Sequence, residues 1–169
     1  MQVTVNGVVR TFETDPRRSL LDLLRESFQM SGTKKGCDQG ACGACTVLLD
    51  GQRVLLCLTL AVQCDGRSLT TIEGIGDRSE LHPLQQAFID QDGFQCGYCT
   101  TGQICSALGM LEEIRRGEPS NVTADLAIGP ETLTREEIRE RMSGNLCRCG
   151  AHNGIVDAIL EFADAGAAR

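Results

Sequence analysis

Ten cysteines in a chain of 169 residues restrict the fold of this protein more than any other feature. Four of them fall in the stretch KKGCDQGACGACTVLLDGQRVLLC, residues 34 to 57, with glycines close to the first three. Two more pairs follow in the stretches FQCGYCT and NLCRCGA. Cysteines at this density form either a disulfide framework, which is typical of small secreted chains, or a set of metal ligands.

The start of the chain favours the second interpretation. The stretch MQVTVNGVVRTF alternates like a strand and lacks the apolar region of an export signal. We therefore expect a cytoplasmic protein whose thiols stay reduced and bind a metal or a cluster. The alternative is a periplasmic protein whose export signal is trimmed or supplied by a partner.

Charge and composition exclude several kinds of partner and chemistry. The net charge of −7 and a sequence pI near 4.8 leave no basic surface for nucleic acid. No stretch is long and apolar enough for membrane insertion. The sequence has no phosphate-binding loop, no dinucleotide glycine fingerprint and no nucleophile paired with a base, so we assign no catalytic residue to it.

The pattern of residues 1–76 predicts a small domain that combines strands with a helix. The dipeptides NG at 6–7 and DG at 50–51 interrupt alternating apolar patterns, which indicates two-residue hairpin turns. Leucines at helical spacing predict a helix over 19–28, for which Ser19 or Asp15 is a suitable N-cap. The stretch RSLTTIEG predicts a closing strand.

Residues 77–169 have a different pattern, which predicts an all-α domain of four helices. The predicted helices cover residues 79–90, 100–115, 134–142 and 153–165. Thr134 and Glu137 have the spacing of a capping box. Segment 116–133 contains two prolines and no periodicity, and connections of this length are usually functional or disordered. The expected fold class is α+β.

The first cysteine set has the spacing C-x4-C-x2-C-x11-C, which is that of a plant-type [2Fe–2S] cluster. Its candidate ligands are Cys37, Cys42, Cys45 and Cys57. Such a cluster needs four thiolates around two irons, so a loop that supplies three of them must curl tightly. Nearby glycines permit this curl and let amide N–H groups approach the sulfurs. We expect Cys57 to come from the strand after the second hairpin.

A structural zinc site is the alternative for this loop, because it also uses four thiolates. Zinc sites usually combine C-x-x-C pairs from two places in the chain. Three cysteines in one glycine-rich loop fit that arrangement poorly, so the spacing favours an iron–sulfur cluster.

The second cysteine set combines a C-x-x-C pair with a distant C-x-C pair, each before a predicted helix. Its candidate ligands are Cys96, Cys99, Cys147 and Cys149. Helix N-termini carry partial positive charge and free N–H groups, so two of them stabilise an anionic [2Fe–2S] cluster. Zinc sites and redox proteins also use C-x-x-C, but the combination of both pairs is more specific.

Two cysteines and two histidines stand outside these sets. Cys64 and Cys105 fall in predicted structured segments, where a thiol behaves as a small buried apolar side chain. His82 and His152 could act as ligands, but four thiolates suffice in each set, so we expect structural or exposed roles. Tyr98, inside the C-x-x-C pair, is expected to shield a cluster from water.

Taken together, these motifs resemble a known family over almost the whole chain. The resemblance is carried by GCDQGACGACTVLLDG, LHPLQQAF, QCGYCTTGQI and MSGNLCRCGAHNGI. They are similar to the iron–sulfur subunit of the molybdenum hydroxylases, the family of xanthine dehydrogenase and aldehyde oxidoreductase. This resemblance implies a β-grasp ferredoxin-like domain at 1–76 and a four-helix domain at 77–169, each with one [2Fe–2S] cluster. The chain departs from the family at Thr101, where proline is usual, and ligation does not depend on that position.

The resemblance also implies the cofactors and partners. The chain would be an electron-transfer subunit, with molybdopterin in its cytosine dinucleotide form on a large subunit and FAD on a medium subunit. Electrons would pass from molybdenum to the helical-domain cluster, then to the β-domain cluster and FAD. Gln95 resembles the family glutamine that hydrogen-bonds molybdopterin, and the alternative is a solvated loop amide.

The expected substrate class depends on the segment between the second and third predicted helices of the all-α domain. Segment 116–133 resembles the longer connection of three-subunit bacterial aldehyde oxidoreductases, which implies oxidation of an aldehyde to a carboxylic acid. The same subunit of a purine or N-heterocycle hydroxylase is one alternative, and a stand-alone two-cluster ferredoxin is another. A stand-alone carrier would have small docking surfaces, whereas a subunit would expose apolar area to its partners.

Overall fold

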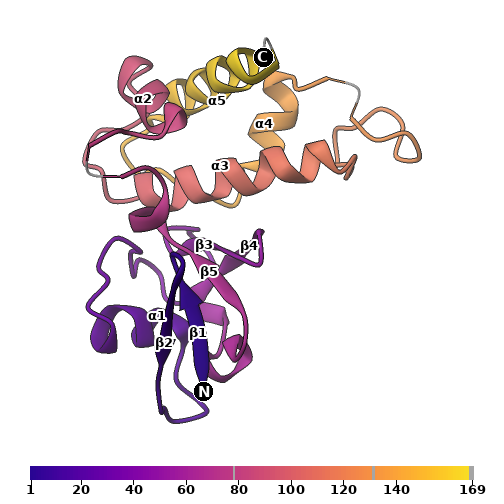
Figure 1. Ribbon diagram of the computed structural model, residues 1–169. Coiled ribbons are helices and arrows are strands. Elements are labelled where there is room, and N and C mark those ends of the chain that lie inside the picture. Colours follow the sequence, from indigo (N-terminus) through magenta and orange to yellow (C-terminus); the bar gives the residue numbers. More distant parts are fainter. Residues whose placement is uncertain (78, 131, 168–169) are drawn as a thin grey trace.

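A computed structural model of the chain describes residues 1–77, 79–130 and 132–167. It consists of a unit with a β-sheet and a helical unit stacked on it, so the predicted α+β class is confirmed (Figure 1). The division of the chain between residues 76 and 77 stays a prediction. The last two residues of the predicted second domain lie outside the described residues.

The N-terminal unit is built on a sheet whose described strands have the order β2-β1-β5-β3-β4. The strands are β1 (Gln2–Val5), β2 (Val8–Thr11), β3 (Thr46–Leu49), β4 (Gln52–Leu55) and β5 (Ser68–Thr70). β1 runs parallel to β5, and the other neighbours are antiparallel. Residues 6–7 and 50–51 join the strands of the two predicted hairpins, which are confirmed. The first and last strands lie side by side inside the sheet, as in a β-grasp fold.

A short helical segment packs against this sheet. α1 (Leu20–Asp22) begins after Ser19, whose Oγ accepts a hydrogen bond from the N–H of Asp22 at 3.1 Å. It continues as a wider π turn, Leu23–Ser27, so the helix predicted at 19–28 exists but is not a regular α-helix throughout. Its four leucines are fully buried in one core with β1, β3 and β5. Burial of each leucine contributes about 1.5–3 kcal/mol.

The helical unit is arranged around one long helix, α3. The helices are α2 (Pro83–Asp90), α3 (Thr100–Arg115), α4 (Arg135–Arg141) and α5 (His152–Ala167). The predicted helices are thus confirmed within two residues at every end but one. The helix predicted from residue 79 begins only at Pro83, because proline suits the first position of a helix. α3 lies between the other helices and the sheet (Figure 1). The buried faces form a separate core that includes Leu84, Phe88, Met110, Ile138 and Ile159.

The long connection between α3 and α4 is held against α4 by a buried carboxylate. Thr134 caps α4 as predicted, and its Oγ1 accepts from the N–H of Glu137 at 3.2 Å. The Glu137 carboxylate does not complete the predicted capping box, because it accepts from Ser120 Oγ at 2.7 Å, from Thr123 Oγ1 and from Arg141 Nε. Burial raises its pKa, but these donors outweigh burial and hold the pKa below its usual value. The predicted loop is therefore anchored at this point.

α3 packs closely on the sheet unit, because small residues face it. A Cβ at Gly102 would lie 2.5 Å from the carbonyl oxygen of Gly43, and a Cβ at Gly109 would overlap the side chain of Arg53. Arg53 on β4 makes a bidentate ion pair with Glu113 on α3, at 2.7 and 2.6 Å. This packing places the start of α3 against the loop that carries the first three cysteines.

Candidate metal centres

Cys37 and Cys42 form one pair in the loop before β3. The N–H of Cys37 donates to Sγ of Cys42 at 3.4 Å, and the N–H of Ala41 donates to Sγ of Cys37 at 3.1 Å. Backbone N–H groups, that of Gln39 above all, lower the pKa of the Cys37 thiol to about 7. Amide donors of this kind favour the thiolate, which is the form that binds metal.

Cys45 and Cys57 form the second pair of the first set, with their sulfurs 3.4 Å apart. Cys57 lies in the 3₁₀ turn Leu56–Leu58 that follows β4, so the expectation of a strand residue was wrong. After β4 the carbonyl of Leu55 accepts from the Thr59 hydroxyl at 3.0 Å, and the N–H of Leu56 donates to the carbonyl of Cys45 at 3.4 Å. Burial raises the pKa of the Cys45 thiol to about 12.

The second cysteine set gathers at the starts of α3 and α5. Cys99 directly precedes α3, and the C-x-C pair precedes α5 by a few residues. The N–H of Ala151 donates to Sγ of Cys147 at 3.4 Å. Cys147 is buried beside Cys99, whereas Cys96 and Cys149 are exposed. The prediction that both pairs stand at helix N-termini is confirmed.

The pKa values in this set follow burial and amide donors. Burial raises the pKa of Cys99 to about 12. Burial also raises the pKa of Cys147, but the N–H of Ala151, the side chain of Cys99 and the N–H groups of Gly150 and Cys149 outweigh burial, so the pKa is lowered overall. The N–H of Tyr98, followed by the side chain of Cys149, lowers the pKa of Cys96. In each set, therefore, burial raises the pKa of one thiol, Cys45 or Cys99, while amide donors lower that of another, Cys37 or Cys96.

The eight thiols therefore lie in four pairs, two in each set. The pairs are Cys37 with Cys42, Cys45 with Cys57, Cys96 with Cys149 and Cys99 with Cys147. Within the ranges that the structure describes, no three Cys, His, Asp or Glu side chains converge on the position of a single ion. A [2Fe–2S] cluster takes two thiolates at each iron, whereas zinc needs four ligands around one point. The donor arrangement fits the two-iron group.

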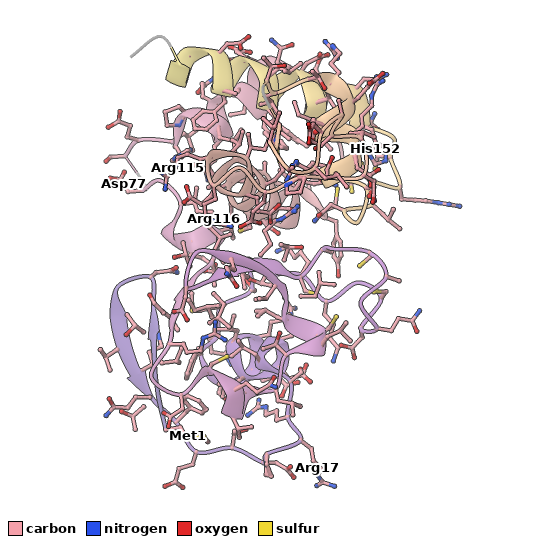
Figure 2. The ribbon with its side chains drawn as sticks, turned by 90° about the vertical axis from the view of Figure 1, so that its right-hand side faces the viewer. Met1, Arg17, Asp77, Arg115, Arg116 and His152 are labelled. Atoms are coloured by element: carbon pink, nitrogen blue, oxygen red, sulfur yellow. The ribbon has the colours of Figure 1, made fainter. Side chains whose placement is uncertain are left out.

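The two sets face one another across a surface cavity of about 440 Å³. Its wall contains Cys37 and Cys42 from the first set and all four cysteines of the second. Tyr98 also lines it, and its hydroxyl donates to the carbonyl of Lys35 at 2.6 Å. Tyr98 thus joins the two loops, a contact that its expected shielding role did not include. Figure 2 shows sulfur atoms gathered at the junction of the two units, on the side that carries His152.

Two buried amides near this junction were missed in the sequence. Asn145 stands two residues before Cys147, and Gln103 stands four residues after Cys99. Both are more than nine-tenths buried, and Gln103 Nε2 donates to the carbonyl of Asn145 at 2.7 Å. Gln103 lies on the predicted helix 100–115, where a polar residue among buried neighbours is the signal that could have found it.

The remaining candidates occupy simpler places. Gln95 is exposed in the loop before Cys96. Cys64 and Cys105 are fully buried, and burial raises the pKa of both thiols, as expected for structural cysteines. His82 caps α2, with Nδ1 accepting from the N–H of Leu84 at 3.2 Å, and His152 is exposed at the start of α5. Both histidines are structural or exposed, as predicted.

Comparison with known proteins agrees with these sites. A model of the 2Fe-2S iron-sulfur cluster binding domain matches residues 3–67, and a model of the [2Fe-2S] binding domain matches residues 71–160. The chain is 58% identical, over 163 residues, to the aldehyde oxidoreductase iron-sulfur-binding subunit PaoA of Escherichia coli, covering 96% of this chain and 71% of that protein. This chain belongs to the iron–sulfur subunits of the molybdenum hydroxylase family.

Other members of the family act on nitrogen heterocycles. The nicotine 6-hydroxylase small subunit of Paenarthrobacter nicotinovorans is 45% identical, with 95% of this chain and 87% of that protein covered. Quinoline 2-oxidoreductase from Pseudomonas putida superimposes with a TM-score of 0.84 at 43% identity, covering 100% of this chain and 94% of that one. As in the family, this subunit carries two [2Fe–2S] clusters and serves electron transfer within a multi-subunit oxidoreductase. No helix in the described part of the chain has the length and apolar character to cross a membrane.

Proposed function

We propose that the two cysteine sets are the ligands of the two clusters of this subunit. The first cluster is assigned to Cys37, Cys42, Cys45 and Cys57, and the second to Cys96, Cys99, Cys147 and Cys149. The arrangement of these thiols in four pairs carries the assignment. When bound, a [2Fe–2S] cluster accepts and releases single electrons. The residues of the chain supply the thiolates, the amide donors to them and the packing that fixes both sites.

We further propose that the subunit serves aldehyde oxidation to a carboxylic acid. Its partners in this proposal are a medium subunit with FAD and a large subunit with molybdopterin. The identity of 58% to an aldehyde oxidoreductase subunit, against 45% to the nicotine 6-hydroxylase small subunit, supports the aldehyde class. The full-length likeness to quinoline 2-oxidoreductase favours an N-heterocycle as the second candidate.

Exposed apolar side chains support a subunit over a stand-alone carrier. Phe94, Tyr98 and Leu146 flank the second cysteine set, and their exposed fractions are 39%, 48% and 53%. Apolar side chains grouped around a functional site are typical of a surface that a partner covers. Gln95 lies beside Phe94 in the same loop and is exposed. We propose that Gln95 hydrogen-bonds the molybdopterin of the large subunit across this surface.

Iron content and paramagnetic resonance test the ligand assignment. The protein as purified should hold about four irons per chain and, when reduced, give two signals of equal amount. Cys42→Ser should remove or alter one signal, and Cys147→Ser the other. Cys105→Ala, a buried thiol outside both sets, should leave both signals intact. A single signal at full iron content would contradict the assignment of two distinct clusters.

Purification from the native host tests the partners and the substrate class. The subunit should co-purify with two larger chains, and the complex should reduce a dye with aldehydes faster than with purines or N-heterocycles. Gln95→Ala should weaken retention of molybdopterin by about 0.5–1.5 kcal/mol, the value of one neutral hydrogen bond. A monomer without partners would instead support a stand-alone ferredoxin.

A further inference from the structure

The side chain of Asn145 lies where the cysteine-bearing segments of both sets meet. Its Nδ2 donates to the carbonyl of Gly43 at 3.0 Å, to Oγ1 of Thr46 at 3.2 Å and to the carbonyl of Gly102 at 3.4 Å. Gly43 lies between two cysteines of the first set, and Gly102 follows Cys99 in the first turn of α3. Only 7% of Asn145 is exposed, so water does not compete for these acceptors.

The backbone at Asn145 and Leu146 also forms hydrogen bonds to the loop of the first set and to α3. The N–H of Leu146 donates to the carbonyl of Cys42 at 2.9 Å, which joins the residue before Cys147 directly to the first set. The carbonyl of Asn145 accepts from Gln103 Nε2 at 2.7 Å, which joins it to α3. Asn145 is thereby held at its backbone and at its side chain, and each contact reaches a segment that carries cysteines.

The backbone is closely packed around these hydrogen bonds. Gly43 has a φ of +71°, and a Cβ there would lie 2.6 Å from Asn145 Nδ2 and 2.6 Å from the carbonyl oxygen of Gly144. A Cβ at Gly102 would lie 2.5 Å from the carbonyl oxygen of Gly43. The segments that contain Gly43, Gly102 and Gly144 are thus tightly packed around the Asn145 amide. Without the N–H donors of this amide, they lose the hydrogen bonds that hold them at this distance.

We propose that Asn145 is a positioning residue that fixes the separation and relative orientation of the two cluster sites. This inference rests on the proposed ligand sets. Asn145 contacts no thiol. Its side chain acts through the carbonyl of Gly43, beside Cys42, through the hydroxyl of Thr46, beside Cys45, and through the carbonyl of Gly102, three residues after Cys99. Electron exchange between two sites falls steeply with their separation, so a residue that fixes this separation governs the exchange.

Paramagnetic resonance of the fully reduced protein measures this separation, because two nearby reduced clusters split each other's signals. Asn145→Asp keeps the shape of the side chain but removes both N–H donors and turns a carboxylate towards three oxygens. We expect the splitting to fall or disappear in N145D while four irons and both signals are retained. Asn145→Ala, which also opens a cavity, should have the same effect.

Ser106→Ala is the matched control. Ser106 is a buried polar residue on the same helix and the same interface, and it accepts a hydrogen bond from Arg53 at 3.1 Å, farther along α3 from the cysteines. S106A should lower the urea midpoint of unfolding and leave the splitting unchanged. If N145D lowers the urea midpoint as S106A does and keeps the full splitting, Asn145 is only structural and the proposal is wrong.

The outcomes separate this inference from the proposed function. If the unmodified protein gives only one signal or holds only two irons per chain, the proposed ligand sets are wrong, independently of the role of Asn145. Two unsplit signals in the unmodified protein would overturn the inference alone, because clusters that Asn145 holds close together must split each other's signals. Where N145D does not assemble clusters, Gln103→Leu replaces it: releasing the Asn145 carbonyl should also reduce the splitting, and an unchanged splitting would refute the proposal.

Discussion

Gly102→Ala tests how closely α3 must approach the first cysteine loop. The new Cβ would lie 2.5 Å from the carbonyl oxygen of Gly43 and 3.0 Å from two backbone atoms of Ala44. The first distance is about 1 Å below an ordinary contact between heavy atoms. Backbone atoms cannot rotate away, so the helix or the loop must move, at a cost of about 3 kcal/mol. The higher helix propensity of alanine stabilises the helix by about 1 kcal/mol, so the free energy of unfolding should fall by about 2 kcal/mol in total.

Anaerobic urea unfolding, followed by circular dichroism, measures this loss. Gly166→Ala is the control, because Gly166 lies exposed in α5 and a Cβ there meets nothing within 4 Å. G166A should stabilise the protein by up to about 1 kcal/mol, since only helix propensity changes. G102A should destabilise it and also reduce the splitting between the two cluster signals. A G102A protein as stable as G166A would refute the reasoning, because α3 would then not be pressed against the loop.

Three further predictions concern the contact between the two units, the anchoring of the long connection, and a buried thiol outside both cysteine sets. Arg53→Met leaves the partly buried Glu113 without its bidentate partner, and the free energy of unfolding should fall by about 2 kcal/mol in urea titrations. Arg53→Lys should recover little of the lost free energy, because the single ammonium of lysine cannot donate two parallel hydrogen bonds to the Glu113 carboxylate. The folded pKa of Glu137 lies below its usual 4.5, so its stabilisation is complete above that pH and is lost as pH falls through the folded value. Limited proteolysis of segment 118–130 should therefore accelerate in acid, and Glu137→Gln should remove this pH dependence. Cys105→Ala should keep about four irons per chain by colorimetric assay and lower only the thermal midpoint.

Local signals in the sequence were sufficient for the elements and for the cysteine sets. The dipeptides at 6–7 and 50–51 determine their turns through local backbone preference, and the helices follow from the spacing of apolar residues. The candidate ligands of the first set follow from the cysteine spacing of a plant-type cluster, and those of the second from two short cysteine pairs, each before a predicted helix. Apart from the grouping of these two pairs, each inference depends on residues that are close together in the chain.

Contacts between distant segments could not be predicted in the same way. Glu137 has a capping-box spacing, but its carboxylate bonds to hydroxyls of the connection, which the packing of α4 brings within reach. Cys57 was predicted on a strand, but it lies in a turn whose contacts include the Thr59 hydroxyl and the sulfur of Cys45, 12 residues earlier in the chain. The role of Asn145 appears only when both units are folded, because its acceptors lie about 40 and 100 residues away in sequence.

The two cysteine sets are completed at very different points along the chain. The first set is complete at Cys57, whereas the second requires Cys149, near the C-terminus. Chains are synthesised from the N-terminus and domains generally fold as they emerge, so the first site can close while the helices are still missing. The hydrogen bond from Leu146 to Cys42 then lets the second site form against a finished loop. We expect cluster insertion to follow the same order, with a ribosome-bound chain able to take up two irons once residues 1–76 have left the exit tunnel.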